Sequence, residues 1–211
     1  MSRALARLRS WLTIDESPSL ESVRQRFVAI DLETTGLDPR RDAMVSLAAI
    51  PFLDGVPAGG YVTLVDPERP IPPESTVVHG LTDGMVRGAP PPEHVLRDVE
   101  PVIEGAVLVG HNVGFDVAVL TRARRARGLP RLGNRSVDTG RLAASLHPEW
   151  RDFSLERIAE RLGVEVVARH TAEGDALTAG RIFVSLLPEL EARRVRTVAE
   201  LLWWERRAPA R

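Results

Sequence analysis

The segment Ala106–Gly110 (AVLVG) carries no polar side chain and is followed directly by polar residues. A strand that shows no alternation between apolar and polar residues has to be covered on both faces, which requires helices above and below one sheet. Apolar runs that predict strands precede this segment, and helical repeats follow it. The chain is therefore expected to fold as an α/β protein.

Further segments are expected to complete the sheet. The Asp54–Gly55 dipeptide between two of them is typical of a tight antiparallel reversal. The expected strands are Arg26–Asp31, Ala43–Leu53, Gly60–Val65 and Arg135–Asp138, besides Ala106–Gly110. The expected helices lie near Asp83–Val86 and at Glu93–Glu104, Val113–Arg127, Thr139–Leu146, Leu155–Leu162 and Thr171–Leu187, with a helical repeat in Glu189–Arg207.

One domain accounts for most of the 211 residues, because 44% hydrophobic residues fill a core of that size and no repeat divides the chain. We expect it to span residues 26–188, between helical extensions at 1–25 and 189–211. Four residues of the first extension recur at helical spacing: Leu5, Leu8, Trp11 and Leu12. Trp203 and Trp204 can dock a partner such as a polymerase, but packing against Trp11 and Leu12 is the favoured interpretation.

Composition limits the kinds of site that the chain can form. Cysteine is absent, which excludes disulfides, thiolate metal sites and a cysteine nucleophile. The longest apolar run, Ala43–Leu53, is far below the roughly 20 residues of a membrane helix, so no membrane association is expected and the chain is predicted to be cytoplasmic. The formal net charge of −1 argues, on its own, against a generic polyanion binder.

Asp31 and Glu33 form the first cluster that can carry chemistry. Residues i and i+2 of a strand point to the same face, so both carboxylates project together while Leu32 enters the core. Two neighbouring carboxylates repel each other unless a cation lies between them, and oxygen ligands favour Mg²⁺ or Mn²⁺. The turn that follows, Thr34–Gly36, offers hydroxyls and a close backbone approach at the end of a strand, where open sheets bind ligands.

The second cluster follows the buried strand, at residues 111–116 (HNVGFD). Asp116 is expected in the first turn of the next helix, where the helix dipole favours a carboxylate. Asn112 is a candidate N-cap of this helix, and Phe115 is expected to belong to the core. Helix capping by these polar groups is the alternative to a role in a site.

The third cluster contains a histidine and an aspartate five residues apart. Thr171 is expected to cap a helix, which leaves His170 outside it and fixes Asp175 one turn inside. This arrangement fits a mobile general base beside an anchored metal ligand. His147 and Asp152 have the same offset, but no apolar strand precedes them, so we expect them to lie in a loop without a role in the site.

The motifs DLETTG at 31–36, HNxxFD at 111–116 and HxAxxDA at 170–176 appear in this order. Together they resemble the three motifs of the DEDDh exonucleases, the family that includes the proofreading epsilon subunit of bacterial DNA polymerase III. Residues 78–82 (VHGLT) resemble a further signature of that family. The resemblance covers about residues 26–188 and implies a ribonuclease H-like fold. That fold is a mixed five-stranded sheet flanked by helices, with its first three strands antiparallel.

The resemblance implies a 3′–5′ exonuclease that releases nucleoside 5′-monophosphates from single-stranded DNA or RNA, with DNA favoured. Two divalent cations, Mg²⁺ or Mn²⁺, are implied to clamp the attacking and leaving oxygens. The metal-binding residues are then Asp31, Glu33, Asp116 and Asp175, and the general base is His170. Thr34, Thr35 and Leu37 are implied to line the terminal nucleotide, with His79, Asn112 and Phe115 as weaker candidates for substrate contact.

Three alternatives stay open. An RNA-trimming exonuclease of the same family is the nearest, and a scaffold module that uses the flanking helices is a minor one. A role in replication or repair as a dedicated polymerase subunit is less favoured than a stand-alone enzyme. Gln25 is the only glutamine of the chain and precedes the first strand, whereas the replicative subunits carry a glutamine-led clamp-binding segment after the catalytic domain.

Positive charge is concentrated in one segment, although the net charge is close to zero. Seven arginines and a single acid, Asp138, lie between Thr121 and Arg141. The arginines are Arg122, Arg124, Arg125, Arg127, Arg131, Arg135 and Arg141. The segment forms either a solvated helix face with its loop or a surface that contacts the phosphates of a nucleic acid.

Overall fold

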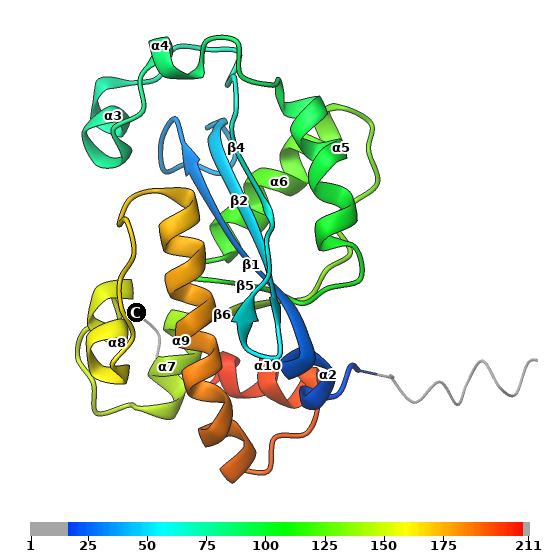
Figure 1. Ribbon diagram of the computed structural model, residues 1–211, viewed down its shortest axis with the longest axis vertical. Coiled ribbons are helices and arrows are strands. Elements are labelled where there is room, and N and C mark those ends of the chain that lie inside the picture. Colours follow the sequence, from blue (N-terminus) through cyan, green and yellow to red (C-terminus); the bar gives the residue numbers. More distant parts are fainter. Residues whose placement is uncertain (1–16, 209–211) are drawn as a thin grey trace, which may run out of the picture.

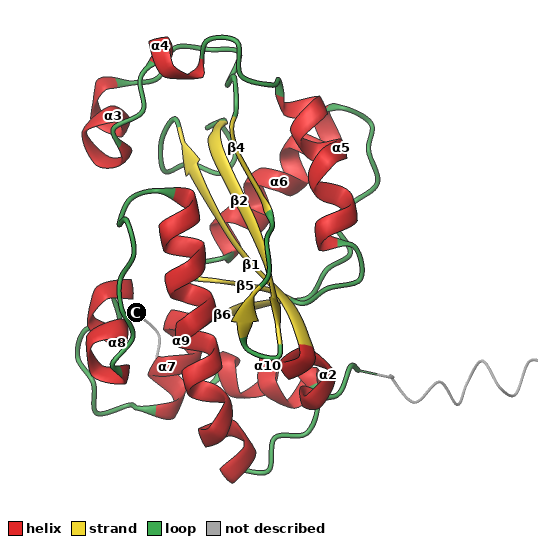
Figure 2. Cartoon of the chain, in the orientation of Figure 1, coloured by secondary structure: helices red, strands yellow, loops and turns green. Residues whose placement is uncertain are grey.

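The computed structural model describes residues 17–208 and shows one mixed sheet with helices on both faces (Figures 1 and 2). The strand order is β3-β2-β1-β5-β6, and β4 also pairs with β2. The strands are β1 (Arg26–Thr34), β2 (Met44–Leu53), β3 (Val56–Pro57), β4 (Tyr61–Leu64), β5 (Leu108–Gly110) and β6 (Ser136–Asp138). β1, β2 and β4 run antiparallel as predicted, and β5 and β6 continue the sheet in parallel.

The sheet has six strands, one more than expected. The additional strand, β3, is only two residues long and follows the reversal at Asp54–Gly55, where both residues have a positive φ, 49° and 79°. It pairs with Phe52 and Leu53, the last residues of β2. The predicted tight reversal is therefore confirmed, and it forms a hairpin too short to be recognised from its apolar content.

Most helices agree with the predicted ranges. They are α2 (Leu20–Gln25), α3 (Pro73–His79), α4 (Asp83–Val86), α5 (Pro92–Ile103), α6 (Gly114–Ala126), α7 (Thr139–Leu146), α8 (Leu155–Leu162), α9 (Ala172–Ala192) and α10 (Val198–Arg206). Helix α3 was not expected, because prolines surround it. Pro73 occupies its first position, where the missing N–H leaves no intrahelical hydrogen bond unmade. Helix α9 continues past Pro188 to Ala192, beyond the predicted end, and Leu190 is fully buried there.

Side chains alternate along β1 between two apolar cores. Phe27 and Ala29 pack with α7, α8, α9 and α10, whereas Val28 and Ile30 pack with α5 and α6 on the opposite face. All three residues of β5 are buried, as its continuous apolar run predicted. The alternation places residues 31 and 33 on the α9 face of the sheet.

Helix α9 crosses β1 and β2 at close range (Figure 1). Gly180 makes this approach possible, because a Cβ atom at this position would lie 2.4 Å from the ring of Phe52 and 3.1 Å from the Cβ of Ala29. The helix therefore begins beside the carboxyl half of β1. The sheet-to-helix spacing at Gly180 thus positions Asp175, in the first turn of α9, against the acidic residues of β1.

The described parts of the two extensions pack against each other. The N–H of Leu20 donates to the carbonyl of Arg196, and the N–H of Val198 donates to the carbonyl of Pro18. Trp204 packs against the α9-side core, whereas Trp203 is 48% exposed. The predicted N-terminal helix and its contact with these tryptophans lie outside the described residues. Within residues 17–208, no helix is long and apolar enough to span a membrane.

Candidate active site

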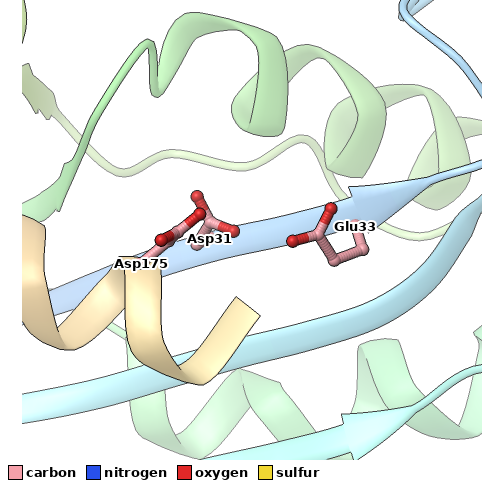
Figure 3. A group of neighbouring side chains, drawn as sticks. All are labelled: Asp31, Glu33 and Asp175. Carbon is pink, nitrogen blue, oxygen red and sulfur yellow. The ribbon is translucent and has the colours of Figure 1, made fainter. Parts of the chain in front are cut away.

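Three carboxylates converge where β1 meets the start of α9. Asp31 and Glu33 extend from the same face of β1, as the i and i+2 spacing predicted, and Asp175 reaches them from α9 (Figure 3). One oxygen of each lies within 4.8 Å of the others. This spacing suits oxygen ligands that share a divalent cation.

The charges of this cluster are poorly compensated. Burial raises the pKa of Asp31 well above its ordinary value, and the neighbouring Asp116 and Asp175 raise it further. Burial and then the charge of Asp175 raise the pKa of Glu33 to about 7. Oδ1 of Asp175 is buried without a hydrogen-bond partner among the described residues. A divalent cation would pair this oxygen and offset the repulsion, so the donor set fits Mg²⁺ or Mn²⁺.

Asp116 lies beside this cluster but outside the group of three. It occupies the first turn of α6, as predicted, and is 4% exposed. Its Oδ1 accepts a hydrogen bond of 3.0 Å from the N–H of Leu32, which lies between Asp31 and Glu33 in β1. Burial raises its pKa well above the ordinary value. The hydrogen bond from Leu32 connects the Asp116 carboxylate to β1, the strand that carries Asp31 and Glu33.

The residues around Asp116 differ in part from the expectation. Asn112 is not the N-cap of α6: Val113 takes that position without a side-chain hydrogen bond, and Asn112 is exposed with a φ of 58°. Its left-handed backbone turns the chain into the helix, a role that asparagine tolerates better than most residues. Phe115 packs partly against the core between the sheet and α5 and α6, as predicted.

His170 lies immediately before α9 on an irregular loop. Its φ of 63° and the φ of 35° at Ala168 are both left-handed. The Thr171 hydroxyl accepts a 3.1 Å hydrogen bond from the N–H of Gly174, which confirms the predicted cap and leaves His170 exposed outside the helix. A Cβ atom at Gly174 would lie 2.1 Å from the carbonyl oxygen of Val167, so the loop lies directly against the helix start.

Arg169 ties this loop to two helices, and sequence reasoning missed it. Its guanidinium group pairs with Asp175 of α9 and with Glu156 of α8. The pairing with Arg169 lowers the pKa of both carboxyl groups, although burial leaves that of Asp175 above its ordinary value. Its position next to His170 was visible in the sequence, but Glu156 is 13 residues away and only the fold brings it close.

A cleft of about 530 Å³ opens beside Glu33. The turn after β1 forms one wall and α3 forms the other. Leu37 is 92% exposed at this cleft, so an apolar side chain is available to a ligand there. Val78 of α3 lines the cleft and is also exposed.

Both threonines of the turn line the cleft, and their hydroxyls also form hydrogen bonds within the turn. The Thr34 hydroxyl donates to the carbonyl of Gly36 at 2.6 Å. The Thr35 hydroxyl donates to Oδ1 of Asp42 at 3.2 Å and accepts from the N–H of Ala43. Both side chains are buried and hold the turn in shape, whereas Leu37 is the exposed apolar side chain of the turn.

His79 lines the cleft and forms hydrogen bonds through both of its ring nitrogens. Its Nδ1 accepts from the N–H of Leu81 at 3.0 Å, and these partners assign the proton to Nε2, which donates to the carbonyl of Thr34 at 3.2 Å. Burial lowers its pKa below the ordinary value. His79 therefore connects α3 to the end of β1, and its ring nitrogens are already used.

The second histidine–aspartate pair, His147 and Asp152, does not belong to the group of Asp31, Glu33 and Asp175. His147 stacks on Trp150 with ring centroids 4.0 Å apart and bonds to Glu189 at 3.0 Å. Asp152 accepts from the N–H of Ser154 at 2.8 Å. Both lie in the loop between α7 and α8, as expected.

The arginine-rich segment is not the open basic surface that its sequence allowed. Arg124 is 4% exposed and pairs with Glu100, and Arg141 pairs with Glu205. Arg127 pairs with Glu68. These pairs hold α6 and α7 in the fold, because each partner belongs to a different element or loop. Arg125, Arg131 and Arg141 are exposed, and of these Arg125 and Arg131 form no ion pair within the described residues.

Comparison with known proteins gives one consistent result. Residues 28–183 match the RNase T family model, which is described as an exonuclease. The chain is 41% identical over 181 residues to a DNA polymerase III subunit epsilon-like protein of Rhodobacter capsulatus, covering 83% of this chain and 26% of that protein. It is 31% identical over 184 residues to the PolC-type DNA polymerase III of Latilactobacillus sakei, covering 84% of this chain and 13% of that one.

Solved structures give the fold. Exonuclease I of E. coli in complex with a dT13 oligonucleotide superposes with a TM-score of 0.70 at 19% identity, over 81% of this chain and 42% of that one. Exonuclease I of Methylocaldum szegediense superposes with a TM-score of 0.64 at 22% identity, over 80% of this chain and 43% of that one. The chain spans less than half of each of these proteins and about a quarter or less of the two sequence relatives.

Proposed function

This chain belongs to the exonuclease family, and we propose that it removes nucleotides one at a time from the 3′ end of single-stranded nucleic acid, with DNA favoured. The observation that carries the proposal is the cluster of Asp31, Glu33 and Asp175, in which a buried carboxylate oxygen lacks a partner among the described residues. The oligonucleotide in the E. coli exonuclease I structure supports DNA as the first substrate to test.

The metal-binding set proposed here consists of Asp31, Glu33 and Asp175, with Asp116 beside them. Two divalent cations held there, Mg²⁺ or Mn²⁺, would withdraw charge from the scissile phosphate and make a water molecule easier to deprotonate. Asp116 would fix the position of the strand through its bond to Leu32. Asp175 would keep its carboxylate aimed at β1, because it is one turn inside a capped helix.

His170 is the proposed general base. It is exposed beside the carboxylates, and the left-handed backbone at this position turns its side chain out of α9. The water oxygen forms a bond to phosphorus as His170 takes the water's proton, and the bond between phosphorus and the 3′ oxygen breaks. The leaving oxygen then takes up a proton, which gives a nucleoside 5′-monophosphate and a strand with a new 3′ hydroxyl.

The cleft between the β1 turn and α3 is the proposed site of the terminal nucleotide. Leu37 would lie against the base, since its exposed apolar side chain gains from contact with an aromatic face. His79 would keep α3 at the right distance rather than contact the substrate. The backbone of the turn would provide donors for the nucleotide, because the Thr34 and Thr35 hydroxyls already donate their protons within the turn.

The direct test is digestion of 5′-labelled single-stranded DNA and RNA with Mn²⁺ or with EDTA. We expect shortening from the 3′ end with Mn²⁺ only, with nucleoside 5′-monophosphates as products. Stronger digestion of RNA would favour the RNA-trimming alternative. Shortening of neither polymer, or equal digestion by an Asp31→Asn protein, would contradict the proposal.

A second experiment separates His170 from an ordinary histidine. His170→Gln is expected to lower kcat by about 10²–10⁴-fold, the usual contribution of a general base. His147→Gln is the matched control, because His147 has the same offset from an aspartate but lies in the loop after α7. Equal activity of the two variants would remove His170 from the mechanism.

A further inference from the structure

Four arginines line a hollow of about 470 Å³ next to the cleft. They come from three separate parts of the chain: Arg40 and Arg41 from the turn after β1, Arg69 from the loop after β4, and Arg122 from α6. Asp38 and Asp42 complete the lining of this arginine hollow. The same two aspartates also line the cleft, so the two depressions share one wall.

None of the four arginines of the hollow forms an ion pair within the described residues, so their charges are opposed only by the two carboxylates that share the lining, Asp38 and Asp42. Arg122 donates only to the backbone carbonyls of Pro39 and Asp42, and Arg69 donates to that of Arg41 at 2.7 Å. A carbonyl oxygen orients a guanidinium group but leaves its net charge in place. Arg69 and Arg41 are also exposed to solvent.

The two aspartates of the hollow accept hydrogen bonds from groups of the turn after β1. Oδ1 of Asp42 accepts from the Thr35 hydroxyl, and its Oδ2 accepts from the N–H of Asp38 at 2.8 Å. Oδ1 of Asp38 accepts from the N–H of Arg40 at 2.9 Å. These bonds shape the turn and direct the two carboxylates to it, and the four arginines and two aspartates together leave the hollow with a net charge of +2.

We propose that the arginine hollow binds backbone phosphates of the substrate strand, 5′ to the nucleotide held in the cleft. The proposal rests on the exonuclease function above and extends it to a second point of contact. Planar guanidinium groups suit phosphate oxygens, and contacts to the backbone are independent of base sequence. A strand that leaves the cleft across the wall formed by Asp38 and Asp42 enters the hollow directly.

The test is the binding of fluorescein-labelled dT12 in EDTA, which prevents hydrolysis, measured by fluorescence anisotropy between 50 and 200 mM salt. The test variant is Arg40→Gln/Arg41→Gln, because both side chains are exposed and neither donates a hydrogen bond within residues 17–208. We expect its dissociation constant to rise about tenfold. We also expect the slope of the logarithm of affinity against the logarithm of salt concentration to be smaller by about 1.4, or about 0.7 for each lost phosphate contact.

The matched control is Arg125→Gln/Arg131→Gln, which removes the same charge from exposed arginines outside the hollow. We expect its dissociation constant to change by less than about twofold. If the test variant binds dT12 as tightly as the wild-type protein, or if the control loses as much affinity, the hollow is not a phosphate site.

A separate measurement distinguishes failure of this proposal from failure of the proposed function. The p-nitrophenyl ester of thymidine 5′-monophosphate is a small phosphodiester that occupies only the cleft. No cleavage of this ester or of dT12 by the wild-type protein with Mn²⁺ would contradict the exonuclease function. The affinities measured in EDTA would still decide whether the arginine hollow binds the strand.

Discussion

Two acidic clusters in this molecule each contain a glutamate with its pKa raised to about 7, yet they are built differently. Near the C-terminal end of α10, burial and the charge of Asp138 raise the pKa of Glu205. Glu205 also pairs with Arg141 at 3.4 Å, and Asp138 caps α7 by accepting from the N–H of Arg141 at 2.9 Å. Each carboxylate of this cluster thus has a partner that belongs to the fold.

In the cluster of Asp31, Glu33 and Asp175, the carboxylates do not all have such partners within the described residues. Its cationic partner in the described chain, Arg169, is shared with Glu156 and forms an ion pair with only one of the three carboxylates, Asp175. Oδ1 of Asp175 is left without a hydrogen bond among the described residues. A raised pKa therefore does not distinguish a site from a structural ion pair, whereas an unpartnered buried oxygen among converging carboxylates does.

The largest effect that would sharpen this comparison is on turnover. Asp31→Asn is expected to lower the rate of nucleotide release by about 10³-fold or more, because it removes several kcal/mol of metal-dependent stabilisation. Glu205→Gln is expected to change that rate less than about threefold, since Glu205 serves packing. Initial rates on labelled single-stranded DNA with Mn²⁺ measure both. A similar loss of rate in the two variants would contradict the distinction between a metal-binding cluster and a structural one.

The next effect is on stability in the presence of metal. Mn²⁺ at about 100 times its dissociation constant is expected to stabilise the wild-type protein by about 2.7 kcal/mol. That corresponds to a rise of roughly 5–10 °C in Tm for a protein of this size. Glu205→Gln should keep this rise and Asp31→Asn should lose it. Thermal unfolding with Mn²⁺ and with EDTA gives the four values, and a rise in the Asp31→Asn protein would place the metal elsewhere.

Arg169 provides a smaller but more specific effect. Arg169→Gln removes the link between α8, the His170 loop and Asp175, and outer partners of a metal ligand typically contribute about 10–100-fold to activity or metal affinity. We expect a loss in that range in both kcat and Mn²⁺ affinity, measured by steady-state kinetics and calorimetry. Arg157→Gln, which breaks an exposed pair with Glu160 on α8, is the control and should change neither.

The smallest effect is the dependence of stability on pH in EDTA. Glu33 and Glu205 hold their protons in the folded protein up to a pKa of about 7 but lose them at lower pH when unfolded. The folded protein thus loses stability as the pH rises, by about 1 kcal/mol for each of these carboxyl groups between pH 6 and 8. Urea unfolding at both pH values measures the change.

Two variants assign this pH effect to its sources. Glu33→Gln and Glu205→Gln should each flatten the pH dependence of the metal-free protein. Only Glu33→Gln should also change the response to Mn²⁺, because only Glu33 belongs to the proposed metal-binding set. A pH dependence that is the same in both variants as in the wild-type protein would show that neither carboxyl group holds its proton in the folded state.

Local rules predicted much of the fold and part of the site. Strand alternation placed Asp31 and Glu33 on one face, and helix capping placed His170 outside α9 and Asp175 inside it. The bond from Leu32 to Asp116 joins residues 84 positions apart, so no local pattern could reveal it.

The arginine hollow illustrates the same limit. The density of arginine along the chain pointed to residues 122–141, but ion pairs with distant acids occupy several of them. The arginines that gather in one hollow are Arg122 together with Arg40, Arg41 and Arg69, which only the tertiary structure assembles. Charge counted along a sequence misses the partners that fold against it.

The contact between Gly180 and the ring of Phe52 has a consequence for how such a chain can change during evolution. A larger residue at position 180 would push α9 away from the sheet and carry Asp175 away from Asp31 and Glu33. A smaller ring or an aliphatic side chain at position 52 would return the helix to its place. The two positions, each outside the carboxylate cluster, are therefore expected to covary among related sequences, with geometry at the cluster as the quantity under selection.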